Sequence, residues 1–142
     1  MIRVTNQLTE QERKVAKALI ASCQAYDQTF REPYLSNILN FDPNMPAFFL
    51  YYQEGELLGL LTVYADDHDV EVAILVAPDY RRKGIARSLF DKFQKETEPY
   101  PIRSVTFQTE RVFLDRHPDL ASHWGVVEDE ETETWLGRDK TP

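Results

Sequence analysis

The chain has 142 residues, 42% of them hydrophobic, which fits a single domain that buries about two thirds of its unfolded surface. Its net charge of −8 argues against nucleic-acid binding, which needs a broad positive surface, and its single cysteine, Cys23, excludes an intrachain disulfide or a cysteine-rich metal site. The longest apolar runs, 47–52 and 72–77, are too short to span a bilayer and no apolar signal segment opens the chain, so we expect a cytoplasmic protein without membrane contact.

The first part of the chain predicts one strand and two helices. Residues 2–5 fit an edge strand, and Thr9 with Glu12 makes a capping box that opens a helix ending before Pro33. A second short helix is predicted over residues 34–39, ahead of a turn-rich stretch.

Three antiparallel strands are predicted next. The apolar runs 47–53 and 56–65 flank Glu54-Gly55, a pair suited to a hairpin because glycine takes positive φ. After a polar reversal at 66–69, the β-branched run 70–76 predicts an interior strand, which Pro78 ends because proline lacks an N–H.

A basic loop then leads into an amphipathic helix. Ile85, Leu89 and Phe93 recur every four residues, so the helix begins near Gly84. Further strands and one helix complete the predicted chain: a strand at 102–108, a short helix beyond Arg111, and a hairpin with strands at 124–127 and 132–137.

The loop and the start of its helix form a candidate anion site. The first amides of a helix lack intrahelical partners and lie at the positive end of its dipole, and Arg81, Arg82 and Lys83 add positive charge. Gly84 leaves room for a ligand to approach the backbone. The alternative is an exposed basic turn that binds nothing. The P-loop and the dinucleotide fingerprint both require more glycines than this stretch contains.

The run Arg81-Arg82-Lys83-Gly84-Ile85-Ala86 resembles the signature Gln/Arg-x-x-Gly-x-Gly/Ala of the GCN5-related N-acetyltransferase (GNAT) family. The strand 71–77 and the turn Pro78-Asp79-Tyr80 resemble the fourth strand of that family and its following turn. The resemblance implies an α+β (α/β) fold in one domain over residues 1–142. It would have a mixed, mostly antiparallel central sheet of about six or seven strands, flanked by about four helices.

The resemblance also implies acetyl-CoA as the acyl donor. In this family the loop amides bind the coenzyme A pyrophosphate, and the preceding strand pairs with the pantetheine arm. The implied coenzyme-binding residues of this chain are Leu75, Val76, Arg81, Arg82, Lys83, Gly84, Ile85, Ala86 and Arg87.

Glu71 is the candidate general base, because it matches the position of a glutamate that acts as base in some family members. Alternation along the strand places it on the same side as Ala73 and Leu75, where partial burial would raise its pKa. The alternative is a solvated residue at the strand end. An amide of Leu75 or Val76 would stabilise the oxyanion.

The general acid is unassigned. Family members often carry a tyrosine in the helix after the fifth strand, but all seven tyrosines lie at or before Tyr100 and Ala121 stands in its place. No metal is expected, since His68, His117 and His123 lack the spacing of a metal site.

Two functions are compatible with these residues. The first is an N-acetyltransferase acting on a primary amine of a small molecule or peptide, with a homodimer as the assembly often found in the family. The second is a catalytically silent acyl-CoA-binding or interaction module, whose acidic hairpin would contact a protein through Trp124 and Trp135. Four aromatic residues would either face the acceptor or belong to the core: Tyr26, Phe30, Tyr34 and Phe41.

Overall fold

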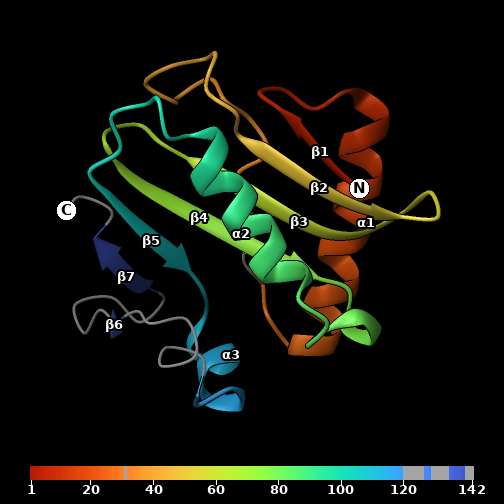
Figure 1. The fold of residues 1–142 in the computed structure, drawn as a ribbon. Coiled ribbons are helices and arrows are strands. Elements are labelled where there is room, and N and C mark those ends of the chain that lie inside the picture. Colours follow the sequence, from red (N-terminus) through yellow and green to blue (C-terminus); the bar gives the residue numbers. More distant parts are fainter. Residues whose placement is uncertain (31, 120–126, 129–134, 140–142) are drawn as a thin grey trace.

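The computed structural model describes residues 1–30, 32–119, 127–128 and 135–139 (Figure 1). The described strands are β1 (Ile2–Thr5), β2 (Phe48–Gln53), β3 (Glu56–Tyr64), β4 (Asp69–Val76), β5 (Ser104–Gln108), β6 (Val127–Glu128) and β7 (Trp135–Asp139). The described helices are α1 (Glu10–Asp27), α2 (Ile85–Glu96) and α3 (Arg111–Arg116), with a 3-10 turn at Pro78–Tyr80. None of these helices is long and apolar enough to cross a membrane.

The strands form one sheet in the order β1-β2-β3-β4-β5-β7-β6. Neighbouring strands are antiparallel, except that β4 and β5 run parallel. Parallel neighbours need a crossover connection, and α2 supplies it between β4 and β5. The structure therefore confirms the predicted α+β class with a mixed, mostly antiparallel sheet.

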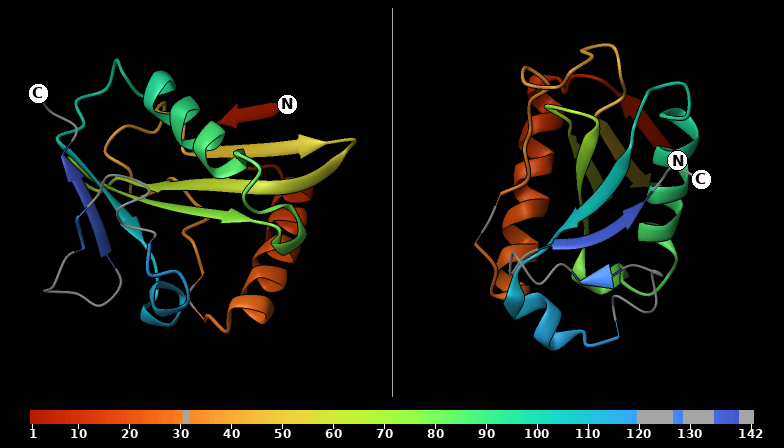
Figure 2. Two further views of the ribbon diagram at one scale, coloured as in Figure 1. Left: turned by 60° about the horizontal axis from the view of Figure 1, so that its bottom comes forward. Right: turned by 90° about the vertical axis from the view of Figure 1, so that its left-hand side faces the viewer.

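The helices α1 and α2 cover opposite faces of this sheet (Figure 2). On the α2 face the helix approaches the sheet closely at Gly59 of β3, where an added Cβ would lie 2.7 Å from Ile85 Cγ2. Only glycine therefore lets α2 settle against β3. The largest fully buried side chains of the core include Phe48, Phe49, Phe90 and Phe93.

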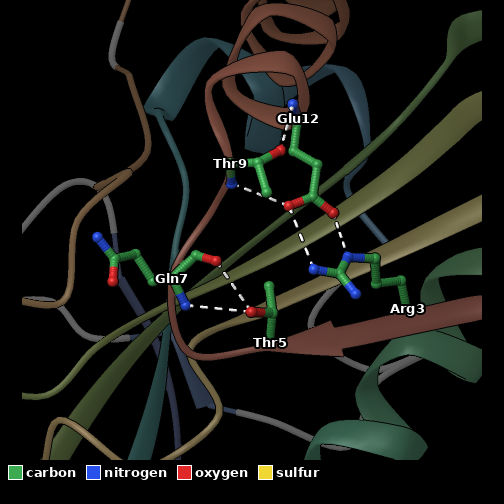
Figure 3. A network of polar contacts seen from close by, with 5 residues as sticks. All are labelled: Arg3, Thr5, Gln7, Thr9 and Glu12. Carbon is green, nitrogen blue, oxygen red and sulfur yellow. Dashed lines mark hydrogen bonds and ion pairs between the residues drawn. The ribbon is translucent and has the colours of Figure 1, made fainter.

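A polar network fixes the start of α1 (Figure 3). The Glu12 amide donates to Thr9 Oγ1 at 3.1 Å and the Thr9 amide donates to Glu12 Oε1 at 2.9 Å, which confirms the capping box. The Glu12 carboxylate also pairs with Arg3 of β1. Burial acts to raise the pKa of Glu12, but the hydrogen bonds from Arg3 and from the Thr9 amide outweigh it and leave the pKa below its ordinary value.

The helix predicted over residues 34–39 is wrong. Residues 32–37 have no regular structure and 38–39 form a turn. Side chains take the amides that a helix would use, because Ser36 Oγ accepts from the Ile38 amide at 3.2 Å and Tyr34 Oη accepts from the Leu39 amide at 3.1 Å. The described residues thus form three α-helices rather than about four.

The predicted C-terminal hairpin is confirmed in its described part. β6 pairs antiparallel with β7, and β7 pairs antiparallel with β5. β6 includes Glu128 and β7 runs to Asp139, beyond the predicted ends at 127 and 137, and the predicted starts at 124 and 132 lie outside the described residues. Trp124 and the acidic residues 129–133 lie outside the described residues.

Candidate active site

β4 and β5 separate at one end of the sheet. Their pairing ends at Val72–Phe107 within the described residues, whereas β4 continues to Val76. The Ala77 amide donates to the Leu58 carbonyl at 2.8 Å, and alternate residues of an antiparallel ladder direct their N–H and C=O groups to the same neighbour. The Leu75 amide therefore faces β3, and the amides of Ile74 and Val76 face the opening beside β5.

A cavity of about 890 Å³ lies at this opening. Its wall on one side comes from Cys23 and Asp27 near the end of α1, and its floor comes from residues 72–76 of β4. The loop and the start of α2 border it at residues 84–87, and the end of β5 and the segment after it border it at residues 107–110 and 116–119.

α2 begins beside this cavity with an uncapped N-terminus. Gly84 precedes the helix with φ of 84°, and no side chain caps the helix. A Cβ added to Gly84 would meet no atom of the described residues within 4 Å, so the glycine is required by its φ and not by crowding. The predicted helix start near Gly84 is confirmed, and the first turn of α2 faces the cavity.

The basic side chains of the loop have different surroundings. Arg82 and Arg87 line the cavity. Lys83 Nζ lies 5.4 Å from the centre of the Tyr80 ring, and Lys83 is not among the cavity residues. Ile85 and Ala86 both line the cavity, and Ile85 is also part of the core, with 5% exposure.

Arg81 is held inside the protein. Its Nη1 and Nη2 donate to the two carboxylate oxygens of Asp27 at 2.6 and 2.7 Å, and its Nε donates to the Val76 carbonyl at 3.0 Å. Its guanidinium carbon lies 5.3 Å from the Tyr26 ring centre and 5.8 Å from that of Phe113. The hydrogen bonds to Asp27 raise the pKa of Arg81 above its ordinary value.

Glu71, the predicted base, is half-buried on β4 opposite Tyr64 of β3. Burial raises its pKa, and the negative charges of Asp66 and Asp67 raise it further. Glu71 does not line the cavity, although Ala73, two residues further along the same strand face, does. Glu71 therefore lies next to the lining residues of β4 without being one of them.

Asp27 and His117 are cavity residues whose place sequence reasoning missed. Burial lowers the pKa of His117, and the positive charge of Arg81 lowers it further. Neither residue has a sequence signal, because Asp27 is only the last residue of a helix and His117 follows a short one. Within the described ranges no group of three or more His, Cys, Asp or Glu residues could hold a metal ion.

The profile of the acetyltransferase (GNAT) family matches residues 13–111. A GNAT-family acetyltransferase from Staphylococcus aureus Mu50 has a similar structure, with 15% identity, a TM-score of 0.73, and coverage of 99% of this chain and 100% of that chain. The catalytic domain of the Tetrahymena GCN5 histone acetyltransferase in complex with coenzyme A is also similar, with 14% identity and a TM-score of 0.67. The match covers 100% of this chain and 93% of that chain.

Diaminobutyrate acetyltransferase EctA from Paenibacillus lautus, in complex with L-2,4-diaminobutyric acid and coenzyme A, gives 12% identity and a TM-score of 0.60. The match covers 98% of this chain and 94% of the EctA chain. At such identities these likenesses show the fold. No curated protein sequence matches the chain.

Proposed function

Since the chain belongs to the GNAT family of acetyltransferases, we propose that it moves an acetyl group from acetyl-CoA directly to a primary amine of a small molecule or peptide. The observation that carries this proposal is the cavity between the separated ends of β4 and β5. It combines a helix N-terminus, which suits a phosphate, with an open strand edge, which suits an extended amide chain. Acetyl-CoA has both groups and supplies the thioester acetyl.

The start of α2 would hold the pyrophosphate. Backbone amides of residues 84–87 and the side chains of Arg82 and Arg87 border the cavity there. A charge-assisted hydrogen bond contributes about 1.5–3 kcal/mol, so a few of them give roughly micromolar affinity. The open edge of β4 at Ile74, whose amide also faces the opening, would align the pantetheine arm.

The chemistry requires a neutral amine and a stabilised oxyanion. An amine with a pKa of about 10.4 is neutral in only about one molecule in 2,500 at pH 7. Glu71 is the proposed base and would accept the proton through one water, because it lies outside the cavity wall. The Val76 amide would donate to the developing oxyanion, and a thiolate with a pKa near 8.5 leaves without an acid.

A thiol-release assay with acetyl-CoA and a panel of small amines, polyamines and peptide N-termini tests the proposal. We expect amine-dependent thiol release from the wild-type protein. Glu71→Gln should lower kcat by about 100-fold with little change in acetyl-CoA affinity, since a base acts on the chemical step. An unchanged pH–rate profile in Glu71→Gln would remove Glu71 as the base.

The position of Glu71 outside the cavity favours one alternative, a catalytically silent acyl-CoA-binding module on the same fold. Calorimetry separates the two functions, because both predict acetyl-CoA binding but only the enzyme predicts turnover. Binding without thiol release across the whole amine panel would support the silent module.

A further inference from the structure

The ion pair between Arg81 and Asp27 lies where α1, β4 and the basic loop meet. The Asp27 side chain is 6% exposed and that of Arg81 is 20% exposed. Each of the three guanidinium nitrogens already donates a hydrogen bond to Asp27 or to Val76. The pair has no net charge, and Arg82 and Arg87 also border the cavity beside α2.

Arg81 acts on the part of β4 that borders the cavity. The Val76 carbonyl accepts from Arg81 Nε at 3.0 Å and from Cys23 Sγ at 3.4 Å. In an antiparallel strand the N–H of a residue faces the same side as its C=O. A carbonyl held by Arg81 therefore fixes the orientation of the residue whose amide faces the β4–β5 opening.

We propose that Asp27 is a positioning residue for acyl transfer: it holds Arg81, and Arg81 holds the Val76 backbone in the orientation that the reaction needs. This inference rests on the proposed function, in which the Val76 amide contacts the thioester. Displacing a reacting group by about 1 Å can cost on the order of 100-fold in rate. Arg81 then serves the thioester end of the donor and not its phosphates.

Two acyl donors separate this role from phosphate binding. S-acetyl-pantetheine carries the thioester but no phosphate. Positioning predicts that Asp27→Asn lowers kcat/KM by about tenfold or more, by the same factor for acetyl-CoA and for S-acetyl-pantetheine. The control variant Arg82→Gln should lower kcat/KM for acetyl-CoA and leave kcat/KM for S-acetyl-pantetheine unchanged. If Asp27→Asn frees Arg81 to bind phosphate, acetyl-CoA will bind more tightly and S-acetyl-pantetheine will be unaffected, which would overturn the proposal.

A double-mutant cycle tests whether the two residues act in one chain. Arg81→Gln and Asp27→Asn should each give a similar loss, and the double variant should be no worse than the poorer single variant. Additive losses would contradict a single chain from Asp27 through Arg81 to Val76. If Asp27→Asn does not fold, Arg81→Lys tests the same role. This variant keeps the positive charge and removes the hydrogen bond from Nε to the Val76 carbonyl, so it should lower the rate in the same way.

A measurement without substrate keeps this inference separate from the proposed function. The ¹⁵N-¹H signal of the Val76 amide in the free protein should shift in Asp27→Asn and exchange faster with solvent, while that of Gly55 at the far hairpin stays unchanged. An unchanged Val76 amide would overturn the positioning role. Absence of thiol release by the wild-type protein would instead count against the proposed function.

Discussion

The two long helices of this molecule begin in opposite ways. At the start of α1 the side chains of Thr9, Glu12 and Arg3 close the helix with a capping box and an ion pair (Figure 3). At the start of α2 a left-handed glycine precedes the helix and no side chain caps it. Every helix begins with amides that need acceptors outside it. One terminus is completed by the chain itself, and the other faces a cavity.

The open terminus has a cost that packing offsets. A side-chain N-cap in place of glycine contributes only about a few tenths of a kcal/mol, which α2 forgoes. Its inner face is almost fully buried, with Leu89, Phe90 and Phe93 at 0% exposure. A buried leucine or phenylalanine contributes about 1.5–3 kcal/mol, so the core holds α2 in place without a cap. The comparison teaches that a helix can leave its first amides available where its other face is well packed.

Gly84→Asp should have the largest effect on the open helix start, because it places a carboxylate at the start of α2. Aspartate tolerates left-handed φ better than most residues, but its charge would repel the phosphates of acetyl-CoA. We expect an affinity loss of about 100-fold or more by calorimetry, which is about 2.7 kcal/mol.

Gly84→Asn is the matched control, because it has nearly the same shape without the charge, and it should lose less affinity. Equal losses in the two variants would assign the effect to shape. Undiminished binding by Gly84→Asp would exclude the start of α2 as the phosphate site.

Thr9→Ala should lower the free energy of unfolding by about 1 kcal/mol, since it removes the cap of α1. Urea denaturation measures this change, and acetyl-CoA affinity should not change. Thr5→Ala is the control, because within the described part of the chain the Thr5 hydroxyl bonds to the exposed Gln7 backbone and should matter less (Figure 3). A loss of coenzyme affinity in Thr9→Ala would show that the two termini are not independent.

Low pH should reduce the free energy of unfolding, because protonation of Glu12 weakens its contacts at the start of α1. Its folded pKa lies below its unfolded value of about 4.3, so ionised Glu12 stabilises the fold above that pH and the contribution is lost as pH falls through the folded pKa. Glu12→Gln should flatten this part of the pH–stability curve. Arg103 and Ser104 hold the pKa of Asp69 at about 2. The loss of stability caused by protonation of Asp69 should therefore remain in the pH–stability curve of Glu12→Gln. An unaltered curve would contradict the role of Glu12.

Arg82→Gln should have the smallest effect, a loss of about three- to tenfold in acetyl-CoA affinity that shrinks at high salt, since exposed charges are screened. Lys83→Gln is the matched control, because Lys83 lies over Tyr80 and outside the cavity wall. Titrations at low and high salt measure both. An equal loss in the two variants would point to the net charge of the loop instead of a contact by Arg82.

The two helix starts could be predicted because their signals are local. Thr9 and Glu12 are three residues apart, and the start of α2 follows from a glycine directly before an amphipathic run. The helix predicted over residues 34–39 fails for an equally local reason, since the Tyr34 and Ser36 side chains accept from backbone amides. The sequence shows that these hydroxyls are present, but it does not show whether they accept hydrogen bonds from the backbone.

The surroundings of Arg81 could not be predicted in this way. The signature motif suggests a phosphate ligand, but the partner of Arg81 lies 54 positions earlier, at the end of α1. The choice between the Leu75 and Val76 amides has the same origin, because it depends on how β4 pairs with β3. Contacts distant in sequence decide which groups of the motif remain available.

The open edge of β4 also bears on how the protein avoids aggregation. A strand edge without a partner can recruit a strand from another molecule, and proteins usually guard such edges with charges, proline or a covering element. Here residues 73–76 form the floor of a cavity walled by the end of α1 and the segment that follows β5. These walls cover the open edge of β4, which is one of the ways in which proteins protect an edge from pairing with a strand of another molecule.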